Sequence, residues 1–283
     1  MADVSKAVLI TGCSTGIGRA TAERLARAGL PVYATARRPE SIEDLKESGC
    51  KTLALDVTDE QSMRAAVEQV EQAEGAVGAL VNNAGYSQSG AIESVKVDDL
   101  RRQFETNVFG LLRMCQLVLP GMRRQHHGRI VNISSMGGKL VFPGGGAYHA
   151  TKFAVEAISD AMRFEVKGFG VDVVLIEPGL IKTEFGTAAS SSIETGTDRE
   201  GPYAEFNAAV AKTTAEAYEG SMSRLAAGPD AVAAAIEKAI TARRPRPRYK
   251  VAASARVMLG LHALLPDRAW DAAVGSTYPR PKA

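Results

Sequence analysis

The chain has 283 residues, of which 45% are apolar and 23% are charged, an ordinary composition for a globular protein. Its 34 lysines and arginines nearly balance 32 acids, and the net charge of +2 indicates no general attraction to nucleic acid or to an anionic membrane. With 27 glycines and 12 prolines, it is neither a low-complexity nor a collagen-like chain.

Apolar, β-branched runs alternate with amphipathic stretches through the first two thirds of the chain. In chain order we predict strand 7–11, helix 17–28, strands 31–36 and 52–56, helix 59–74, strand 79–82, helix 98–125, strand 129–134, helix 147–167 and strand 171–177. Near-continuous Val/Ile/Leu strands separated by helices favour a parallel sheet covered on both faces. Right-handed crossovers make this a doubly wound, Rossmann-like α/β domain.

The pattern weakens after Pro178. Residues 186–202 are small, polar and turn-rich, which predicts a mobile loop, and helices follow over 203–226 and 229–242. A last strand is predicted over 248–251, and the tail holds a short apolar helix candidate before Pro-rich disorder. We therefore expect one domain over 1–252 with a substrate lid at about 184–226. The C-terminal extension 253–283 is expected to pack on the same domain or on a partner subunit.

The cysteines and histidines indicate neither a disulfide framework nor a metal site. Cys13, Cys50 and Cys115 are widely spaced without a C-x-x-C motif, so we expect reduced thiols in a cytoplasmic protein. No H-E-x-x-H motif occurs, and we expect surface positions rather than metal ligands for the four histidines, His126, His127, His149 and His262. The polar N-terminus is unlike a signal peptide, and the apolar stretch 257–265 is too short for a membrane span.

A glycine-rich stretch, TGCSTGIG over 11–18, directly follows the first predicted strand and opens the first predicted helix. Gly12, Gly16 and Gly18 permit a tight turn and let backbone N–H groups approach a pyrophosphate at the positive end of the helix. Their G-x-x-x-G-x-G spacing differs from the commoner G-x-G-x-x-G, and taken alone it could mark only a tight turn.

Tyr148 and Lys152 lie at i and i+4, on one face of a predicted helix. A nearby ammonium group favours the phenolate and lowers the pKa of a tyrosine from about 10, so the phenol can give and take a proton near neutral pH. Ser135 precedes them at the carboxyl edge of the sheet, where such folds bind ligands. Its hydroxyl could hold a carbonyl or alcohol oxygen beside the tyrosine.

These motifs together resemble the short-chain dehydrogenase/reductase family in its single-domain branch, which includes hydroxysteroid and retinoid dehydrogenases and carbonyl reductases. The resemblance covers residues 7 to about 250. It rests on TGCSTGIG (11–18), Asp56-Val57, NNAG (82–85), Asn107, ISS (133–135) with YHATK (148–152), and PGLIKT (178–183). It implies an oxidoreductase that interconverts a carbonyl and an alcohol, and a homodimer or homotetramer.

The resemblance implies roles for the matched residues. Tyr148 would be the general acid in reduction and the base in oxidation, with Ser135 orienting the substrate oxygen. Lys152 would bind the nicotinamide ribose and assist Tyr148, and Asn107 would anchor a water relay behind Lys152. Further cofactor contacts would come from Gly12, Ser14, Gly16, Ile17, Gly18, Asp56, Val57, Asn83, Ala84, Gly85, Pro178, Gly179, Ile181 and Thr183.

Some of these residues have simpler interpretations. Asn107 could be only a helix-surface amide, and Asp56 only a helix-entry residue. Asn82 is interpreted as structural, a tie between neighbouring strands. The presence of both Tyr148 and Lys152 favours an enzyme over a non-catalytic dinucleotide-sensing regulator on the same fold. The other alternative is an epimerase or dehydratase of the extended branch, and the G-x-x-x-G-x-G spacing and the lack of a sizeable C-terminal domain count against it.

The segment after the second strand predicts that NADP(H) is the preferred cofactor, with NAD(H) as the alternative. An acid there would bind the ribose 2′-hydroxyl and repel a 2′-phosphate. The position expected to carry the acid is Ala36, and the next residue, Arg37, has a guanidinium group that suits phosphate. Ser14 could add a donor and Arg38 a second cation. Otherwise the two arginines would be solvated residues that open a loop.

The residues expected around the substrate are apolar, with no arginine among them to bind a carboxylate: Met136, Leu140, Val141, Phe142, Leu180 and Phe185. We therefore predict a mainly apolar substrate larger than a simple sugar or hydroxy acid, although some of these side chains could serve the core or a subunit contact. The basic cluster 243–248 lacks interleaved aromatic residues and is interpreted as a solvated loop, not as a nucleic-acid site.

Overall fold

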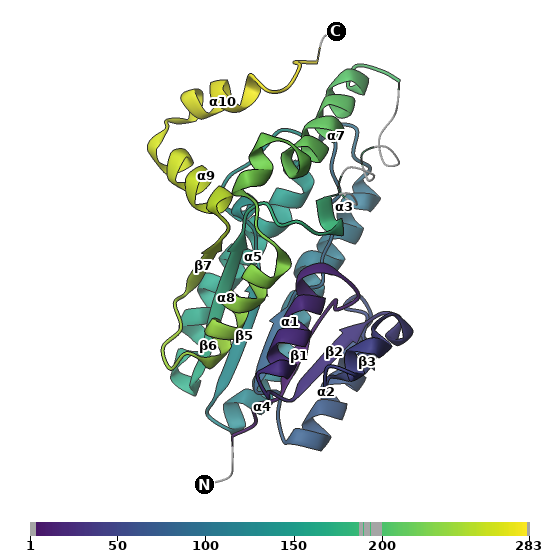
Figure 1. Ribbon diagram of the computed structural model, residues 1–283, viewed down its shortest axis with the longest axis vertical. Coiled ribbons are helices and arrows are strands. Elements are labelled where there is room, and N and C mark those ends of the chain that lie inside the picture. The colour runs from purple at the N-terminus through teal and green to yellow at the C-terminus, as the bar shows by residue number, and fades with distance from the viewer. Residues whose placement is uncertain (1–3, 187–188, 190–192, 194–199, 282–283) are drawn as a thin grey trace.

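The computed structural model describes residues 4–186, 189, 193 and 200–281. Within them, the centre of the molecule is a seven-stranded parallel sheet in the order β3-β2-β1-β4-β5-β6-β7 (Figure 1). Its strands are β1 (Val8–Ile10), β2 (Val32–Ala36), β3 (Lys51–Ala54), β4 (Ala79–Asn82), β5 (Gly128–Ile133), β6 (Val171–Pro178) and β7 (Arg248–Val251). The predicted doubly wound parallel sheet is confirmed.

Helices cover both faces of this sheet, and two further helices follow at the C-terminal end. They are α1 (Gly16–Arg27), α2 (Glu60–Glu74), α3 (Val97–Phe104), α4 (Leu111–Arg124), α5 (Gly146–Glu165), α7 (Ala204–Glu219), α8 (Pro229–Thr241), α9 (Ala253–Leu264) and α10 (Asp267–Gly275). Short 3₁₀ helices span Pro39–Lys46, Met136–Gly138, Lys167–Phe169 and Ser221–Leu225.

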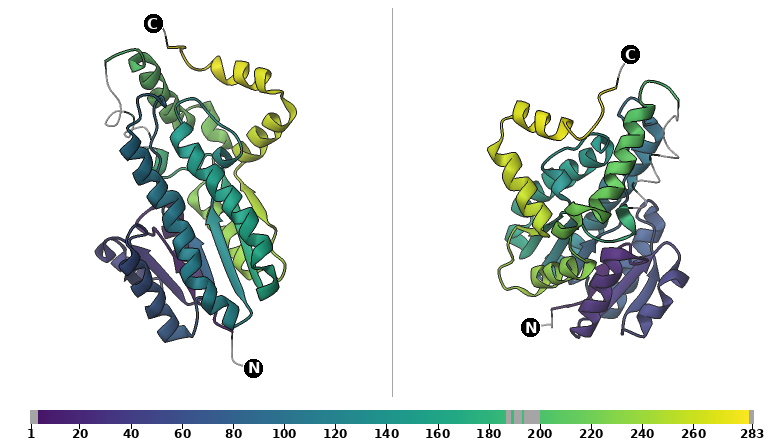
Figure 2. Two further views of the ribbon diagram at one scale, coloured as in Figure 1. Left: turned by 180° about the vertical axis from the view of Figure 1, so that it is seen from behind. Right: turned by 45° about the horizontal axis from the view of Figure 1, so that its top comes forward.

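The sheet buries a separate apolar cluster on each face, because successive side chains of a strand point to opposite faces. Leu9 of β1 belongs to the cluster formed with α2, α4 and α5, whereas its neighbours Val8 and Ile10 belong to the cluster formed with α1 and α8. The view from behind in Figure 2 shows α4 and α5 side by side over the first of these faces. Two packed layers therefore hold the carboxyl ends of the strands in fixed positions.

Several element boundaries differ from the predictions. The single helix predicted over 98–125 is α3 and α4 joined by a π turn, Glu105–Gly110, which changes the phase of the helix at Asn107. The strand predicted over 52–56 ends at Ala54, because Asp56 turns the chain by accepting hydrogen bonds from the backbone N–H (2.9 Å) and hydroxyl (2.7 Å) of Thr58.

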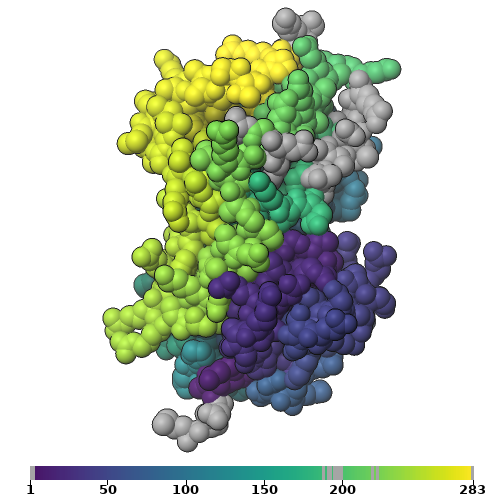
Figure 3. Space-filling model, viewed as in Figure 1, coloured from purple at the N-terminus to yellow at the C-terminus, as the bar shows by residue number. Residues whose placement is uncertain are grey.

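The C-terminal tail packs on the sheet domain. Leu259 of α9 and Trp270 of α10 are buried in a cluster with Leu140. At the end of the tail, where Pro-rich disorder is predicted, the ring of Tyr278 packs on Phe206 with 6.3 Å between centroids. Figure 3 shows this segment, in yellow, lying against the green α7 region.

The basic cluster 243–248 and the loop 186–202 were both predicted to be surface segments. Arg248 is not part of a solvated loop, because it starts β7 and pairs with Glu156 and Glu177. The mobile loop expected over 186–202, and with it part of the expected lid over 184–226, falls largely on residues outside the described ranges; residues 184–186 are helical. Within the described residues, no helix has the length and apolarity that crossing a membrane requires.

Candidate active site

The carboxyl ends of the strands open into a cavity of about 1390 Å³. Doubly wound sheets bind their ligands at this edge. The motif residues converge here: of the site residues predicted from the sequence, all except Gly18 and Asn107 line the cavity. They come from both halves of the sheet, so the fold brings together segments that are more than a hundred residues apart in the chain, such as Gly12 and Tyr148.

The glycine loop is held in shape by the segment that follows β4. The Asn83 side-chain amide donates hydrogen bonds to the carbonyls of Thr11 (3.0 Å) and Gly12 (2.8 Å). Gly12 and Gly16 have φ of +74° and +58°, values that favour glycine. A Cβ atom at Gly12 would lie 2.9 Å from the Cα of Ala84, and one at Gly18 would overlap the Gly12 carbonyl. Gly18 therefore permits close packing instead of reaching the cavity.

This loop fits the pyrophosphate of a dinucleotide. Helix α1 begins at Gly16, and the side chain of Thr15 makes no capping hydrogen bond to it. The first N–H groups of a helix carry a partial positive charge and bind anions when no side chain satisfies them. Because Thr15, Gly16 and Ile17 all line the cavity, this end of α1 is available to a phosphate group there.

Arg37 lies at the end of β2 and lines the same cavity. Its side chain is exposed, and it makes no hydrogen bond or ion pair with any residue that the structure describes. Ala36, at the position expected to carry an acid, is 5% exposed. The guanidinium group of Arg37 is therefore uncommitted, and the carboxylate that would oppose a 2′-phosphate is absent from Ala36.

Tyr148, Lys152 and Ser135 form the polar centre of the cavity. The Lys152 ammonium donates a hydrogen bond to the Ile133 carbonyl (2.8 Å) and lies 5.7 Å from the centre of the Tyr148 ring. Burial lowers the pKa of Lys152 to about 8, while the charge of Glu156 acts in the opposite direction. Ser135 Oγ accepts a hydrogen bond from the Gly137 N–H (3.0 Å), which leaves its O–H as a donor. This set can hold an oxygen atom and move a proton.

Asn107 lies behind this centre and is not a helix-surface amide. It is 1% exposed, its Oδ1 accepts from the Tyr86 N–H (3.1 Å), and its Nδ2 donates to the Tyr86 carbonyl (2.9 Å) and to Thr151 Oγ1 (3.1 Å). The side chain thus joins the π turn to the segment after β4 and to α5. Asn82, for its part, donates to Asn132 Oδ1 (2.9 Å) and so links β4 to β5.

His149 was expected on the surface, and this prediction is wrong. The side chain is 7% exposed, lines the cavity beside Tyr148 and accepts a hydrogen bond from the Phe142 N–H at Nδ1 (3.2 Å). Burial lowers its pKa to about 4, so the imidazole is neutral at neutral pH. Its position directly after Tyr148 in the same helix could have indicated from the sequence that it lies near the site. Within the described residues, no group of His, Cys, Asp and Glu could hold a metal ion.

The apolar end of the cavity differs from the prediction at two positions. Met136, Phe142, Leu180 and Phe185 line it, whereas Leu140 and Val141 do not. Leu140 is 1% exposed and belongs to the core cluster with Trp270, and Val141 is 46% exposed outside the cavity. Sequence analysis did not predict that α7 and α10 supply walls of the cavity. The i, i+3, i+4, i+7 spacing of the lining residues in each helix could have indicated these faces.

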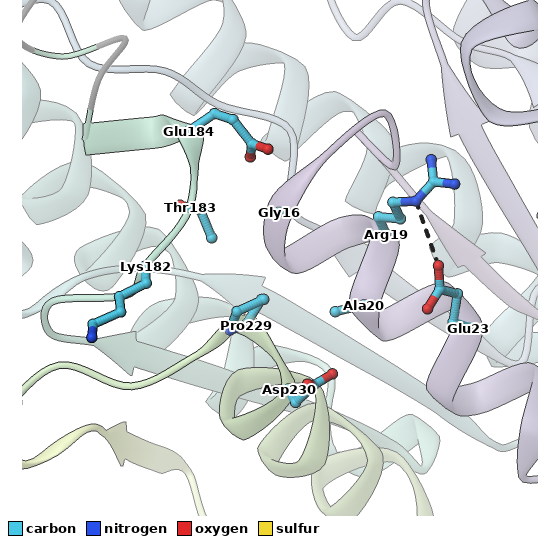
Figure 4. Close-up of a pocket in the computed structure, with 9 residues that line it drawn as sticks. All are labelled: Gly16, Arg19, Ala20, Glu23, Lys182, Thr183, Glu184, Pro229 and Asp230. Atoms are coloured by element: carbon cyan, nitrogen blue, oxygen red, sulfur yellow. Dashed lines mark ion pairs between the residues drawn. The ribbon is translucent and has the colours of Figure 1, made fainter.

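A second, smaller hollow of about 280 Å³ lies on the outer side of Gly16 and Thr183 (Figure 4). Its arginine, Arg19, is paired with Glu23 at 3.4 Å. Tyr148, Lys152 and Ser135 are not among its lining residues. The larger cavity is therefore the candidate active site.

A model of the short-chain dehydrogenase family matches residues 6–194. The chain belongs to the short-chain dehydrogenase family. A 3-ketodihydrosphingosine reductase of Bacteroides thetaiotaomicron is 41% identical over 194 residues, covering 68% of this chain and 70% of that protein. An NADPH-dependent 3-dehydrocapnine reductase of Ornithobacterium rhinotracheale is 35% identical over 272 residues, covering 93% and 94%. This short-chain dehydrogenase is thus an oxidoreductase.

Solved structures agree with this family and fold. A short-chain dehydrogenase from Streptomyces avermitilis has a TM-score of 0.79 at 34% identity, over 96% of both chains. One from Burkholderia phymatum, in complex with NAD, has a TM-score of 0.78 at 24% identity, over 100% of both chains. The second likeness concerns the fold alone and does not decide which cofactor this short-chain dehydrogenase uses.

Proposed function

We propose that this short-chain dehydrogenase is an NADP(H)-dependent oxidoreductase that interconverts a carbonyl and an alcohol on a mainly apolar substrate. The observation that carries the proposal is the convergence of Tyr148, Lys152 and Ser135 in one cavity with the glycine loop. The uncommitted Arg37 supports the choice of NADP(H), as does the printed description of the Ornithobacterium relative as NADPH-dependent. The related reductases support a ketone as the group acted upon.

The proposed chemistry divides between the cofactor and this chain. The cofactor supplies or accepts a hydride when bound. In the direction of reduction, Tyr148 gives its hydroxyl proton to the carbonyl oxygen, which Ser135 holds by a hydrogen bond. The ammonium of Lys152 stabilises the phenolate that remains on Tyr148. Oxidation reverses these proton transfers, so Tyr148 is the base for the alcohol.

The remaining site residues have supporting roles in the proposal. The glycine loop and the start of α1 hold the pyrophosphate, and Arg37 with Ser14 holds the 2′-phosphate. Asp56 and Val57 contact the adenine, and Asn83, Ala84 and Gly85 line the middle of the cofactor. Pro178, Gly179, Ile181 and Thr183 surround the nicotinamide. Asn107 is a positioning residue, because its side chain bonds to Tyr86 and Thr151.

Replacement of Tyr148 by phenylalanine tests the mechanism. The Tyr148→Phe variant keeps the ring and its packing on Phe185 but lacks the transferable proton. Because general acid–base catalysis contributes about 10²–10⁴-fold, we expect kcat to fall by about that factor while NADPH binding, followed by fluorescence, is retained. Tyr249→Phe, on β7 outside the cavity, is the matched control. Turnover within twofold of the wild type would remove Tyr148 from the mechanism.

A panel of ketones and alcohols, followed by the absorbance of the reduced cofactor, separates the competing functions. Intact cofactor binding without turnover of any compound would favour the dinucleotide-sensing regulator over the oxidoreductase. Turnover of small charged substrates alone would contradict the apolar substrate class.

The oligomeric state and the cellular compartment of this protein are also part of the proposal. Phe109 of the π turn and Phe153 of α5 are 51% and 43% exposed, which supports a homodimer or homotetramer that covers them. Sedimentation of the purified chain measures the oligomer directly. Cys13, Cys50 and Cys115 are free, buried thiols, which supports a reducing compartment such as the cytoplasm.

A further inference from the structure

The cavity continues beyond Tyr148 into a compartment between two helices from distant parts of the chain. In Figure 1, α7 and α10 both rise above the carboxyl ends of the strands, on opposite sides. Pockets for one small ligand usually measure about 300–1000 Å³. The whole cavity, at about 1390 Å³, therefore has room for a second ligand beside a dinucleotide.

One wall of the compartment is a face of α7. Val210, Thr213, Thr214 and Ala217 line the cavity, at positions i, i+3, i+4 and i+7 of the helix. The hydroxyl of Thr214 donates a hydrogen bond to the Val210 carbonyl (2.8 Å), so its polar atom is satisfied within the helix. This wall is therefore mainly apolar and made of small or medium side chains.

The facing wall comes from α10 and from Thr277, two residues beyond the end of this helix. Trp270, Ala273, Val274 and Thr277 line the cavity with the same i, i+3, i+4, i+7 spacing. Over seven residues a helix rises about 10 Å, so each wall extends for about two turns. Among the described side chains of α7, α9 and α10 that line the cavity, none is charged.

Aromatic contacts hold the two walls in place. Trp270 is 7% exposed and packs on Phe142 (6.0 Å) and His262 (4.8 Å between ring centroids), which fixes α10 on the domain. At the far end, Tyr278 packs on Phe206 of α7. At the near end, the Phe185 ring lies 5.5 Å from the Tyr148 ring. These contacts place the uncharged walls of α7 and α10 on the same cavity as the proposed reaction centre.

We propose that this compartment, the α7–α10 slot, binds the unbranched alkyl chain of the substrate and makes this short-chain dehydrogenase selective for long-chain ketones and alcohols. The inference rests on the proposed function, because the oxygen-bearing carbon must reach Ser135 and Tyr148. Each methylene group that enters the slot leaves water for an apolar surface, which favours binding in proportion to chain length. Small side chains on both walls leave the space that the chain occupies.

The test compares butan-2-one, octan-2-one and dodecan-2-one as substrates with NADPH. We expect kcat/KM to rise at least tenfold from the shortest to the longest ketone. Ala273→Phe and Ala217→Phe fill the slot from opposite walls and should lower the ratio of kcat/KM for dodecan-2-one over butan-2-one at least tenfold. Ala272→Phe and Ala215→Phe, at exposed neighbouring positions that do not line the cavity, should leave that ratio within twofold.

A second readout does not depend on turnover. Trp270 is the one tryptophan of the chain and lines the slot, so its fluorescence reports occupancy directly. Without cofactor, dodecan-2-one should change this emission saturably in the wild type and in Ala272→Phe, with at least tenfold weaker binding in Ala273→Phe.

The outcomes separate the slot from the proposed function. Saturable binding without turnover of any ketone would overturn the oxidoreductase proposal and support the slot. Turnover that is independent of chain length, or no saturable change at Trp270, would overturn the slot. Equal kcat/KM for cyclododecanone and dodecan-2-one would also overturn it, because a bulky ring and an extended chain of the same carbon number would then fit alike.

Discussion

The side chain of Lys152 is buried, and its ammonium group donates a hydrogen bond to the Ile133 carbonyl at the end of β5. Burial lowers the pKa of this group from 10.5 to about 8, and the charge of Glu156 partly opposes that effect. A buried ammonium group disfavours the folded state, yet the proposed mechanism needs it charged beside Tyr148. Stability and catalysis therefore conflict at this residue.

The conflict predicts that Lys152→Met is inactive but more stable at pH 7. The difference between a pKa of 10.5 and one of about 8 means that the charged Lys152 destabilises the folded state by roughly 3 kcal/mol, which the variant gains. The variant also loses the hydrogen bond to Ile133, which offsets about 1 kcal/mol of that gain. We expect the free energy of unfolding to rise by about 2 kcal/mol, as measured in urea.

The pH dependence of the free energy of unfolding tests whether folding lowers the pKa of Lys152. Between pH 8 and 10.5 the unfolded chain binds the Lys152 proton and the folded chain does not, so the wild type gains stability from this group as pH rises. The advantage of Lys152→Met should therefore disappear near pH 10.5. An equal difference at both pH values would contradict a lowered lysine pKa.

The cofactor preference is a second prediction at the scale of single residues. In Ala36→Asp/Arg37→Ala the added carboxylate repels a 2′-phosphate and the guanidinium that would bind it is gone. We expect kcat/KM for NADPH relative to NADH to fall at least a hundredfold. Arg27→Ala, at an exposed position of α1 that does not line the cavity, serves as the control. A wild type that prefers NADH, or an unchanged preference in the double variant, would refute the role of Arg37.

At the scale of an element, the π turn places Asn107 inside the fold. A continuous α-helix over the predicted range 98–125 would present residue 107 at a different angle, because a π turn inserts an extra residue into the helical phase. The turn lets both ends of the Asn107 amide reach Tyr86 while the same side chain bonds to Thr151 of α5.

We expect Asn107→Ala to lower the free energy of unfolding by about 2 kcal/mol, because it leaves the Tyr86 N–H without its partner, whereas the Tyr86 carbonyl keeps the hydrogen bond from the Gln103 amide (3.1 Å). Urea titration of this variant beside Thr106→Ala measures the effect. Among the described residues, the Thr106 hydroxyl bonds only to the Arg102 carbonyl, four residues earlier (3.3 Å), so its loss should change stability by less than about 0.5 kcal/mol. Equal stability of the two variants would show that the Asn107 bonds contribute little.

At the scale of the whole molecule, Arg248 joins the last strand of the sheet to elements far away in the chain. It lies 3.0 Å from Glu156 of α5 and 3.0 Å from Glu177 of β6, carboxylates that are 4% and 0% exposed. Burial, together with the charge of Glu156, raises the pKa of Glu177. Ion pairs between Arg248 and two buried carboxylates thus hold the edge strand β7 against α5 and β6.

Arg248→Met should lower the free energy of unfolding at pH 7 by about 3–5 kcal/mol, because it leaves buried carboxylates without this partner. The loss should be smaller at pH 5, since Glu177 with a raised pKa takes up a proton in the folded chain before it does so in the unfolded chain. Arg246→Met, at an exposed position, controls for the loss of one positive charge. A loss that grows toward pH 5 would contradict the raised pKa of Glu177.

The sequence by itself determined the alternation of strands and helices and the family. Short apolar runs and the helical period of 3.6 residues are local properties, and they predict β4 at 79–82 and α5 close to its observed range without knowledge of the rest of the chain. The motif residues after β1, β4, β5 and β6 also follow from the sequence, because parallel strands bring their carboxyl ends to one edge of the sheet.

Only the tertiary structure decided which side chains face one another across long sequence distances. Leu140 is core while its neighbour Val141 is exposed, Arg248 is paired rather than solvated, and His149 is buried beside Tyr148. The faces of α7 and α10 are each recognisable as a helical pattern, but nothing local shows that they oppose each other. The physical reason is that burial and pairing depend on neighbours supplied by other parts of the chain, and those neighbours exist only after the chain has folded.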